Sequence, residues 1–387
     1  MRCCINFLKK LICILLILSL AGCWNRRELD TLAIVMATGV DKPKESGEVQ
    51  LTAQIVKIGE IKTPTEKSGG SDKAYWNIHN TSSTVFDAVR GFTHESGRKL
   101  FFPHNQVLIF GRKLAEDGVQ KYTDFFLRDP EPRLNMWVII SKGTAVEVLD
   151  VKSELEKIPA SNIAHLVEIQ SATSQTSIVK LKDFLTRLMS KTTAPIAPLI
   201  EVSGEGENKT IILSGTAVFK RDKLVGQLDR RETRGLLWVL GEVKSGIIEV
   251  ECSDGDDKAG LEIIRADGKI TPVIDEDKIT IKVNIEEEGN LAEQACSQNL
   301  ASPENIEKLK KEKAAVIKEE VMAAIIKARE LNTDIFGFGD AIHQKYPKQW
   351  KDLEDRWDEV FPKIEVEITV ETKLRLTGMT NRPAMPE

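Results

Sequence analysis

The sequence predicts an α+β protein of several domains, in which mainly antiparallel sheets are flanked by helices. Two patterns carry this prediction. Apolar and polar residues alternate in 49–55 and in 279–285, as they do in strands that have one solvated face. In 178–188 and 303–331, apolar residues instead recur at helical spacing, which is typical of helices that pack one face on a core.

The first half of the chain alternates between predicted strands and predicted helices. Residues 32–37 are apolar on both alternations, so this strand is expected to be covered on both faces and to pair antiparallel with 49–55. Further strands are predicted at 75–78, 106–110 and 136–140, and helices around 85–92, 119–126, 163–169 and 178–188. Residues 59–73 are expected to form a polar loop, and 192–198 to end this run of elements.

The second half contains more hairpins. Residues 211–219 and 224–228 flank a tight polar turn, and Asp229 with Glu232 predicts a capped helix after it. A meander of four strands is expected at 248–252, 261–264, 270–274 and 279–285, with turns at Asp254-Gly255 and Asp267-Gly268. The last strand, 364–376, is predicted to be the longest.

Ser302-Pro303 predicts the start of a long helix, because serine caps a helix and proline suits its first turn. The helix can extend to Leu331, which gives a length of about 44 Å at 1.5 Å per residue. One face carries apolar residues: Ile306, Leu309, Ile317, Val321, Ile325 and Ala328. We expect this face to lie on the meander rather than in a coiled coil with a partner.

These elements predict a division of the chain into four parts. Residues 1–22 form a lipoprotein signal peptide, and 23–203 an N-terminal α+β region that is one unit or two subdomains. Residues 204–380 form a C-terminal α+β domain with the helix 303–331 on its meander, and 381–387 are a tail. The boundary is placed in the polar, glycine-containing stretch 201–209.

The N-terminus is typical of an exported, lipid-anchored protein. The cationic start is followed by the apolar run 11–20, which is too short to span a bilayer core of about 20 helical residues. Leu20-Ala21-Gly22-Cys23 fits the lipobox pattern, in which the Cys23 thiol receives a diacylglycerol. Its two acyl chains supply firm anchoring. Trp24 is expected either among the lipid headgroups or against the first domain.

Charge and cysteine content exclude several classes of protein. The formal charge of −5 becomes about −8 once the signal's three cations are removed, which argues against nucleic acid and against electrostatic adhesion to anionic lipid. Only Cys252 and Cys296 remain as free thiols after processing. They could pair in an oxidising compartment, but we favour two separate buried thiols, and the domain is expected to fold without metal, cofactor or disulfide.

No motif for catalysis is present. The five histidines are isolated in the sequence, and neither an HExxH nor a GxSxG pattern occurs. Gly337-Phe338-Gly339 lacks the third glycine of a dinucleotide fingerprint and follows a helix. The acidic stretch 254–257 lacks the spacing of a calcium loop. The sequence therefore predicts a protein that is not an enzyme and has no cofactor or metal.

Residues 332–361, here called the closing segment, join the long helix to the last strand. Trp350 and Trp357 recur there at helical spacing. We favour core packing for both rings. The alternative is that they contact a membrane partner, because aromatic side chains dominate many interfaces.

Both ends of the mature chain resemble the Ger(x)C family, the lipoprotein C subunits of nutrient germinant receptors in endospore-forming bacteria. The resemblance rests on two groups of motifs. The N-terminal group is 20–29, Ala33-Ile34-Val35 and Gly39-Val40-Asp41; the C-terminal group is Asp334 to Gly339, Tyr346-Pro347, Trp350, Trp357 and the strand running to Gly378.

The resemblance implies a non-enzymatic subunit on the outer face of the spore inner membrane. Its partners would be a receptor A subunit and a transporter-like B subunit, both in the membrane, and it would have three α+β domains. The alternative is an extracytoplasmic substrate-binding lipoprotein of a transporter. That class shows repeated strand–helix–strand units, whereas the second half of this chain is a run of predicted hairpins.

Overall fold

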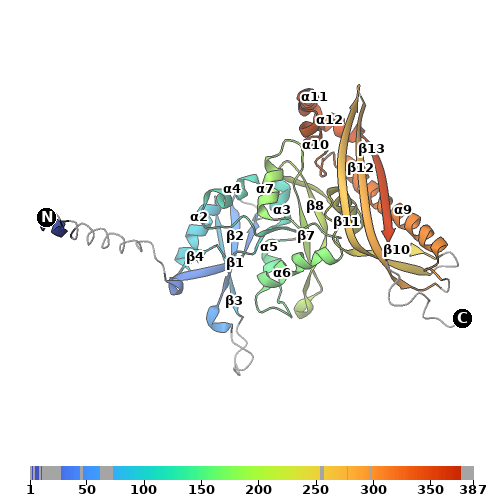
Figure 1. The fold of residues 1–387 in the computed structure, drawn as a ribbon. Coiled ribbons are helices and arrows are strands. Elements are labelled where there is room, and N and C mark those ends of the chain that lie inside the picture. Colours follow the sequence, from blue (N-terminus) through green and yellow to red (C-terminus); the bar gives the residue numbers. More distant parts are fainter. Residues whose placement is uncertain are drawn as a thin grey trace.

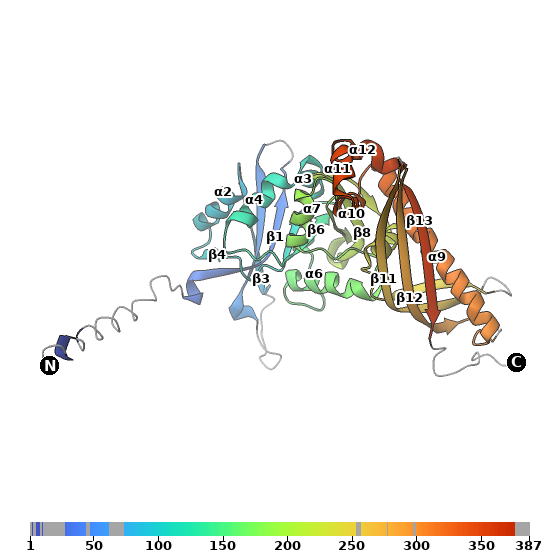
Figure 2. The same cartoon turned by 45° about the horizontal axis from the view of Figure 1, so that its top comes forward.

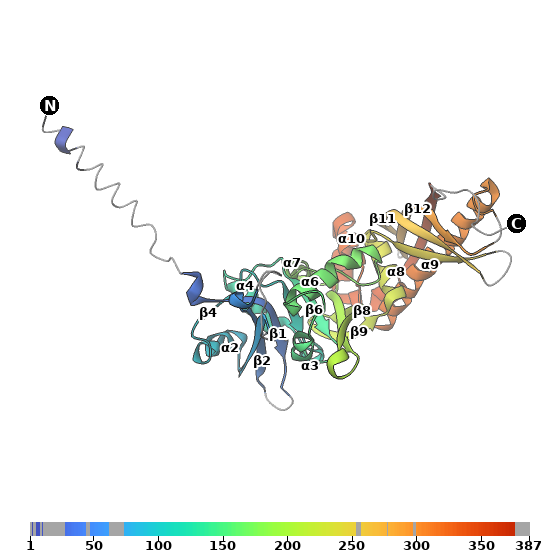
Figure 3. The same ribbon diagram turned by 90° about the horizontal axis from the view of Figure 1, so that it is seen from below.

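The structure is a computed structural model of the 387-residue chain. It describes residues 2, 5–7, 10, 28–43, 47–61, 73–252, 257–276, 278–296 and 299–375. Two sheets flanked by helices follow one another along the molecule (Figures 1 and 3). The predicted α+β class is confirmed.

The first sheet has nine strands, and its centre is parallel. In chain order the strands are β1 (Leu32–Asp41), β2 (Val49–Val56), β3 (Tyr75–Ser82), β4 (Lys99–Phe101), β5 (Val107–Phe110), β6 (Trp137–Ser141), β7 (Ile196–Ser203), β8 (Thr210–Lys220) and β9 (Lys223–Leu228). Their order across the sheet is β3-β2-β1-β5-β6-β7-β8-β9, with β4 beside β1. The steps β1-β5-β6-β7 are parallel, and antiparallel pairs lie on both sides of them.

Helices cover both faces of this sheet, which explains why β1 and β5 are apolar on both alternations. The helices are α2 (Val85–Gly91), α3 (Arg112–Asp117), α4 (Gln120–Arg128), α5 (Ala145–Asp150), α6 (Pro159–Glu168) and α7 (Leu181–Met189). Phe126 of α4 and Phe184 of α7 are buried in one core, and Val148 of α5 and Ile163 of α6 in the other. At the end of β1, Asp41 accepts the N–H groups of Ala145 and Val146 and so fixes the start of α5.

Sequence reasoning did not predict every element of this sheet. It missed β4. It also predicted that 192–198 end the run of helices and strands, whereas β7 begins at Ile196. The predicted boundary between 203 and 204 falls in the turn between β7 and β8, whose ends pair at Ser203 and Thr210. The hydrogen bonding of one sheet therefore continues through it, and its status as a boundary between folding units stays a prediction. The predicted loop 59–73 lies largely outside the described residues.

The second sheet has the order β10-β11-β12-β13. Its strands are β10 (Gly246–Glu251), β11 (Lys258–Asp275), β12 (Lys278–Gln294) and β13 (Glu365–Leu374). The helix α8 (Arg230–Leu240) leads into the sheet, and α9 (Pro303–Glu330) lies across it (Figures 1 and 2). Both helices begin where the sequence predicts, because Asp229 forms a capping box with Glu232 and Ser302 accepts the N–H of Asn305.

Two predictions about this sheet are wrong. Asp267-Gly268 is not a turn, because β11 continues through it as one strand of 18 residues paired along β12. The glycine instead permits close packing of α8, since a Cβ atom at Gly268 would lie 2.2 Å from the carbonyl oxygen of Trp238. β13 is also not the longest strand, and it pairs parallel with β12. Asp254-Gly255 lies outside the described residues.

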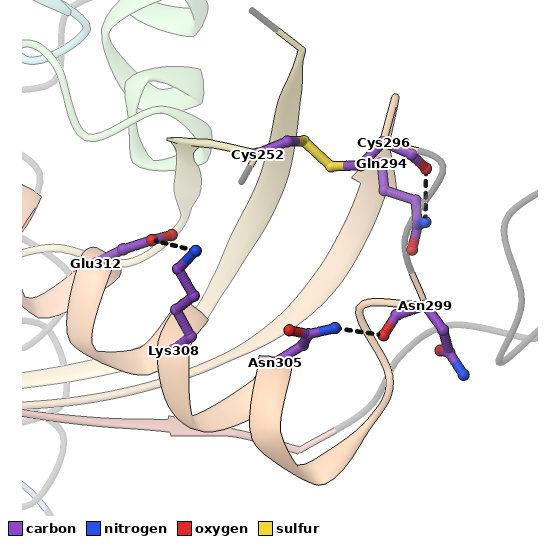
Figure 4. Close-up of a disulfide and its surroundings, with 7 residues drawn as sticks. All are labelled: Cys252, Gln294, Cys296, Asn299, Asn305, Lys308 and Glu312. Atoms are coloured by element: carbon purple, nitrogen blue, oxygen red, sulfur yellow. Dashed lines mark hydrogen bonds and ion pairs between the residues drawn. A yellow bond between two sulfur atoms is a disulfide. The ribbon is translucent and has the colours of Figure 1, made fainter. Parts of the chain in front are cut away.

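The prediction of two separate thiols is also wrong. Cys252, just after β10, and Cys296, just after β12, form a disulfide with their Cα atoms 6.0 Å apart (Figure 4). Cysteines separated by 44 residues carry no signal of pairing in the sequence. Antiparallel pairing of both strands with β11 brings them together.

We expect reduction of this disulfide to lower the free energy of unfolding by about 2–4 kcal/mol, because the crosslink restricts the unfolded chain. Urea denaturation with and without reductant measures the effect. The double variant Cys252→Ala/Cys296→Ala is the control, and its stability should not respond to reductant. Equal stability of the oxidised and reduced wild-type chains would contradict the expectation.

Candidate functional site

Four residues were singled out from the sequence: Cys23 for lipid attachment, and Trp24, Trp350 and Trp357 as candidate contacts with a partner or the membrane. Cys23 and Trp24 lie outside the described residues, so their roles stay predictions. Trp350 and Trp357 lie in the closing segment, with 3% and 6% of their surface exposed, and their ring centres are 5.2 Å apart in an edge-to-face arrangement. Their indole rings belong to the core of the described structure, as the favoured interpretation had it.

The closing segment folds as three short helices beside the upper end of the second sheet (Figure 2). They are α10 (Phe338–Lys345), α11 (Pro347–Leu353) and α12 (Trp357–Val360). A continuous set of ring contacts holds them together, formed by Phe336, Phe338, His343, Trp350, Trp357 and Phe361. Lys345 also donates to the carbonyl oxygen of Pro272 on β11 over 2.9 Å. The helices of the closing segment are thus held to one another by ring contacts and to the second sheet by a hydrogen bond.

Asp334 organises the turn that begins this segment. Its Oδ1 accepts the N–H groups of Phe336, Gly337 and Phe338 at 2.9–3.2 Å, and its Oδ2 accepts that of Gly339 at 2.8 Å. These include N–H groups of the first turn of α10, where a negative charge is favourable. Gly337 has a φ of +80°, which favours glycine.

The same turn joins the two sheets. We call the contacts of residues 187–194 with 334–340 the sheet joint. Across it, the N–H of Ala194 donates to the carbonyl of Asp334 over 2.8 Å, and Arg187 donates to the carbonyl of Ile335 over 2.9 Å. Asp340 accepts hydrogen bonds from three hydroxyl groups: Ser190, Thr192 and Thr193.

The joint leaves little free space. A Cβ atom at Gly339 would lie 2.8 Å from the Cβ of Thr192 and 3.0 Å from the ring of Trp350. Both distances are shorter than ordinary contacts between carbon atoms of about 3.5–4.0 Å. A glycine is therefore required at position 339, because the loop that contains Thr192 and the ring of Trp350 both lie against it.

Burial raises the pKa of the Asp334 carboxyl to about 6, and its four N–H bonds oppose the rise. Between about pH 4 and pH 6, the folded chain keeps a proton that the unfolded chain has released. The stabilising contribution of this group is therefore complete below about pH 4 and is lost as the pH rises through 6. For a shift of about two pKa units it amounts to about 3 kcal/mol.

We expect the free energy of unfolding of the wild-type chain to fall by about 3 kcal/mol between pH 3 and pH 7 relative to Asp334→Asn, which has no carboxyl group to titrate. Urea denaturation at a series of pH values measures this difference. The exposed Asp183→Asn is the control and should follow the wild type. A difference between wild type and Asp334→Asn that does not change with pH would refute the assignment.

α9 carries two buried ion pairs that hold it to the rest of the second half. Lys313 is fully buried and donates to Glu287 of β12 over 2.6 Å. A Cβ atom at Gly289 would lie 2.2 Å from the Lys313 ammonium nitrogen, so the strand leaves space for the lysine only because a glycine is there. Burial lowers the pKa of Lys313 and raises the pKa of Glu287.

The second ion pair joins α9 to α8. Glu320 receives Arg234 through both carboxylate oxygens, and the indole N–H of Trp238 donates to the same carboxylate over 2.8 Å. A further N–H of Arg234 donates to the carbonyl of Ile247 on β10 over 2.9 Å. These contacts fix the position of α9 along its own axis.

Sequence reasoning missed most of the polar residues described here. Lys313 lies in the apolar stripe of α9, four residues from both Leu309 and Ile317, and this position was the available signal. Asp334 was identified only as part of the stretch 334–339 that resembles the family, and its role in the turn was not predicted. Nothing in the local sequence marks Arg187, because its partners come from a distant part of the chain.

The described residues give no sign of a metal centre. Nowhere in them do three or more histidine, cysteine, aspartate or glutamate side chains gather as a possible set of ligands.

The described part of the chain contains no helix with the length and apolar character needed to cross a membrane.

Two family descriptions match the chain in succession. "Spore germination protein N-terminal domain" matches residues 25–202, and "Spore germination B3/ GerAC like, C-terminal" matches residues 214–378. Similar proteins from Bacillus subtilis (strain 168) include spore germination protein KC, 27% identical over 97% of each chain. Spore germination protein A3 is 25% identical, over 97% of this chain and 98% of that protein.

A solved structure has a similar fold. The crystal structure of the GerBC protein aligns with 87% of this chain and 96% of its own, with a TM-score of 0.55 and 19% identity. At this identity the comparison concerns the fold alone.

Proposed function

This chain belongs to the GerAC-like family of spore germination proteins, and we propose from this premise that it is a non-catalytic, lipid-anchored subunit of a nutrient-sensing germinant receptor complex. Its partners would be the A and B membrane subunits of the receptor. It would lie on the outer face of the spore inner membrane, held there by a diacylglycerol on Cys23.

The observation that carries this proposal is similarity along the whole chain. The two matched regions are separated only by residues 203–213, which comprise the end of β7, the turn after it and the start of β8. The relatives match over nearly their full length. Nearly the whole of this chain is therefore aligned with proteins named for spore germination. The Cys252–Cys296 disulfide supports a location outside the cytoplasm, because such bonds persist in oxidising compartments.

The candidate contact residues would have different parts in this proposal. Trp24, next to the acylated cysteine, would sit among lipid headgroups. Trp350 and Trp357 are buried, so they would support a partner contact by fixing the shape of the closing segment rather than by touching the partner.

Cys23→Ala tests the anchor. We expect an uncleaved or mislocalised precursor and a sharp fall in nutrient-triggered germination, because the variant lacks the thiol that would carry the lipid. Fractionation of spore membranes and the rate of germination are the measurements. Cys13→Ala, in the apolar run of the signal, is the matched control and should behave as the wild type. Normal membrane retention of the Cys23→Ala chain would refute the anchor.

Purification of the tagged chain from spore membranes tests the partners. We expect the A and B receptor subunits to be recovered with it. A transporter permease in their place would favour the alternative of a substrate-binding lipoprotein.

A further inference from the structure

We infer that one surface of the first sheet contacts the membrane directly, in addition to the lipid anchor. This anchor-side surface consists of Ile58 and Ile61 at and after the short helix η2 (Ile58–Glu60), Trp76 of β3, and the cavity beside them. The inference rests on the proposed acylation of Cys23. It specifies which face of the protein lies on the lipid.

The anchor-side surface exposes three large apolar side chains at one place. Ile58, Ile61 and Trp76 are 55%, 49% and 41% exposed. Ile58 and Trp76 line a cavity of about 600 Å³, together with Leu32 and Ala33 at the start of β1 and the cationic Lys57 and Arg98. Apolar groups gathered in this way on a soluble surface mark a binding site for a protein or a membrane.

The position of the surface along the chain favours the membrane. Leu32, which lines the cavity, is nine residues after Cys23. Even a fully extended chain of that length spans only about 30 Å, at 3.3–3.6 Å per residue. η2 and the start of β1 lie at the same end of the molecule, far from the second sheet (Figures 1 and 2). An acyl anchor on Cys23 would therefore hold this end close to the lipid headgroups.

The chemistry of the surface also fits a bilayer interface. Tryptophan is enriched at membrane–water interfaces because its ring is apolar and its N–H is polar. Lysine and arginine can place their aliphatic stems on apolar groups while their charges stay in water. Glu60 and Glu95 line the same cavity and balance the two cations, so the contact would depend on apolar insertion rather than on anionic lipid.

The far end of the molecule offers a contrast. The outer face of the second sheet carries ion pairs between neighbouring strands, Lys278 with Glu365 at 2.6 Å and Lys282 with Glu367 at 3.4 Å. A face of paired charges suits water. The first sheet would thus lie on the membrane, and the second sheet would project toward the partners.

Tryptophan quenching tests the contact. The full-length chain, purified as the processed lipoprotein, is placed in phosphatidylcholine vesicles whose acyl chains are brominated near the glycerol backbone. The background is Trp24→Phe, because that residue lies beside the anchor. We expect fluorescence quenching that is mostly lost on adding Trp76→Phe. It should persist in high salt and be unchanged by adding Trp137→Phe, a matched change in β6.

A second pair of variants tests the neighbouring side chains. Ile58→Ser/Ile61→Ser should reduce the quenching of Trp76 at least twofold, while Ile326→Ser, an equally exposed change on α9, should leave it unchanged. Vesicle-bound chains in which Trp76 is not quenched would overturn the inference and leave the anchor intact. Quenching that high salt abolishes would also overturn it. A chain that does not bind the vesicles at all would refute both the anchor and the contact.

Discussion

Replacing Lys313 by methionine should lower the free energy of unfolding by about 3–5 kcal/mol, the cost of removing one partner of a buried ion pair. Methionine fills a similar volume but leaves the Glu287 carboxylate without its cation in the core. Burial already raises the pKa of Glu287, and Oε2 of this residue has no hydrogen-bond partner among the described residues. Urea denaturation at neutral pH measures the loss.

A double variant separates charge from packing. Lys313→Met/Glu287→Leu should recover most of the stability, because two apolar groups can replace a buried ion pair at little cost. The exposed Lys318→Met on the same helix is the control and should change stability by less than about 0.5 kcal/mol. If the double variant is as unstable as the single one, the lysine acts through its shape and the explanation from charge fails.

Trp350→Ala should lower the free energy of unfolding by about 3–5 kcal/mol, because it removes a large buried ring. The ring packs on Trp357 and His343 and lies against Gly339 of the sheet joint. Loss of the ring should therefore loosen the closing segment and the joint together. Thermal and urea unfolding measure the stability, and limited proteolysis detects the loosened segment.

Trp76→Ala is the matched control, since this ring is 41% exposed, and it should change stability far less. Recovery of Trp350→Ala in the receptor complex adds a second measurement. A variant that melts early and is scarce in the complex supports core packing. A variant that melts normally and is absent from the complex would show that this ring itself contacts a partner.

Sequence patterns correctly predicted the helices whose ends are determined by neighbouring residues. Ser302-Pro303 and the apolar stripe predicted α9 within a residue of its observed ends, and Asp229 with Glu232 predicted the start of α8. The elements that failed depend on distant partners. Asp267-Gly268 resembles a turn until the length of β12 is known, because only a long neighbour can continue the hydrogen bonding of β11.

Dependence on distant partners also limited what the sequence could predict of the candidate site. The resemblance identified the stretch from Asp334 to Gly339, but its role follows from the loop at 190–194, which no pattern connects with it. The Cys252–Cys296 bond was missed because only the alignment of β10 and β12 on β11 brings the two residues together. The burial of Trp350 and Trp357 was predicted, since two such rings at helical spacing usually serve a core.

The parallel pairing of β13 with β12 has a consequence for how the chain folds. Thr280 pairs with Glu365, so α9 and the whole closing segment must emerge before the second sheet can be completed. Until then β12 is an open strand edge, which can pair with other chains and start aggregation. Contacts between such distant residues also form slowly. We therefore expect nascent chains that end before β13 to need protection from aggregation, and the last strand to complete the fold.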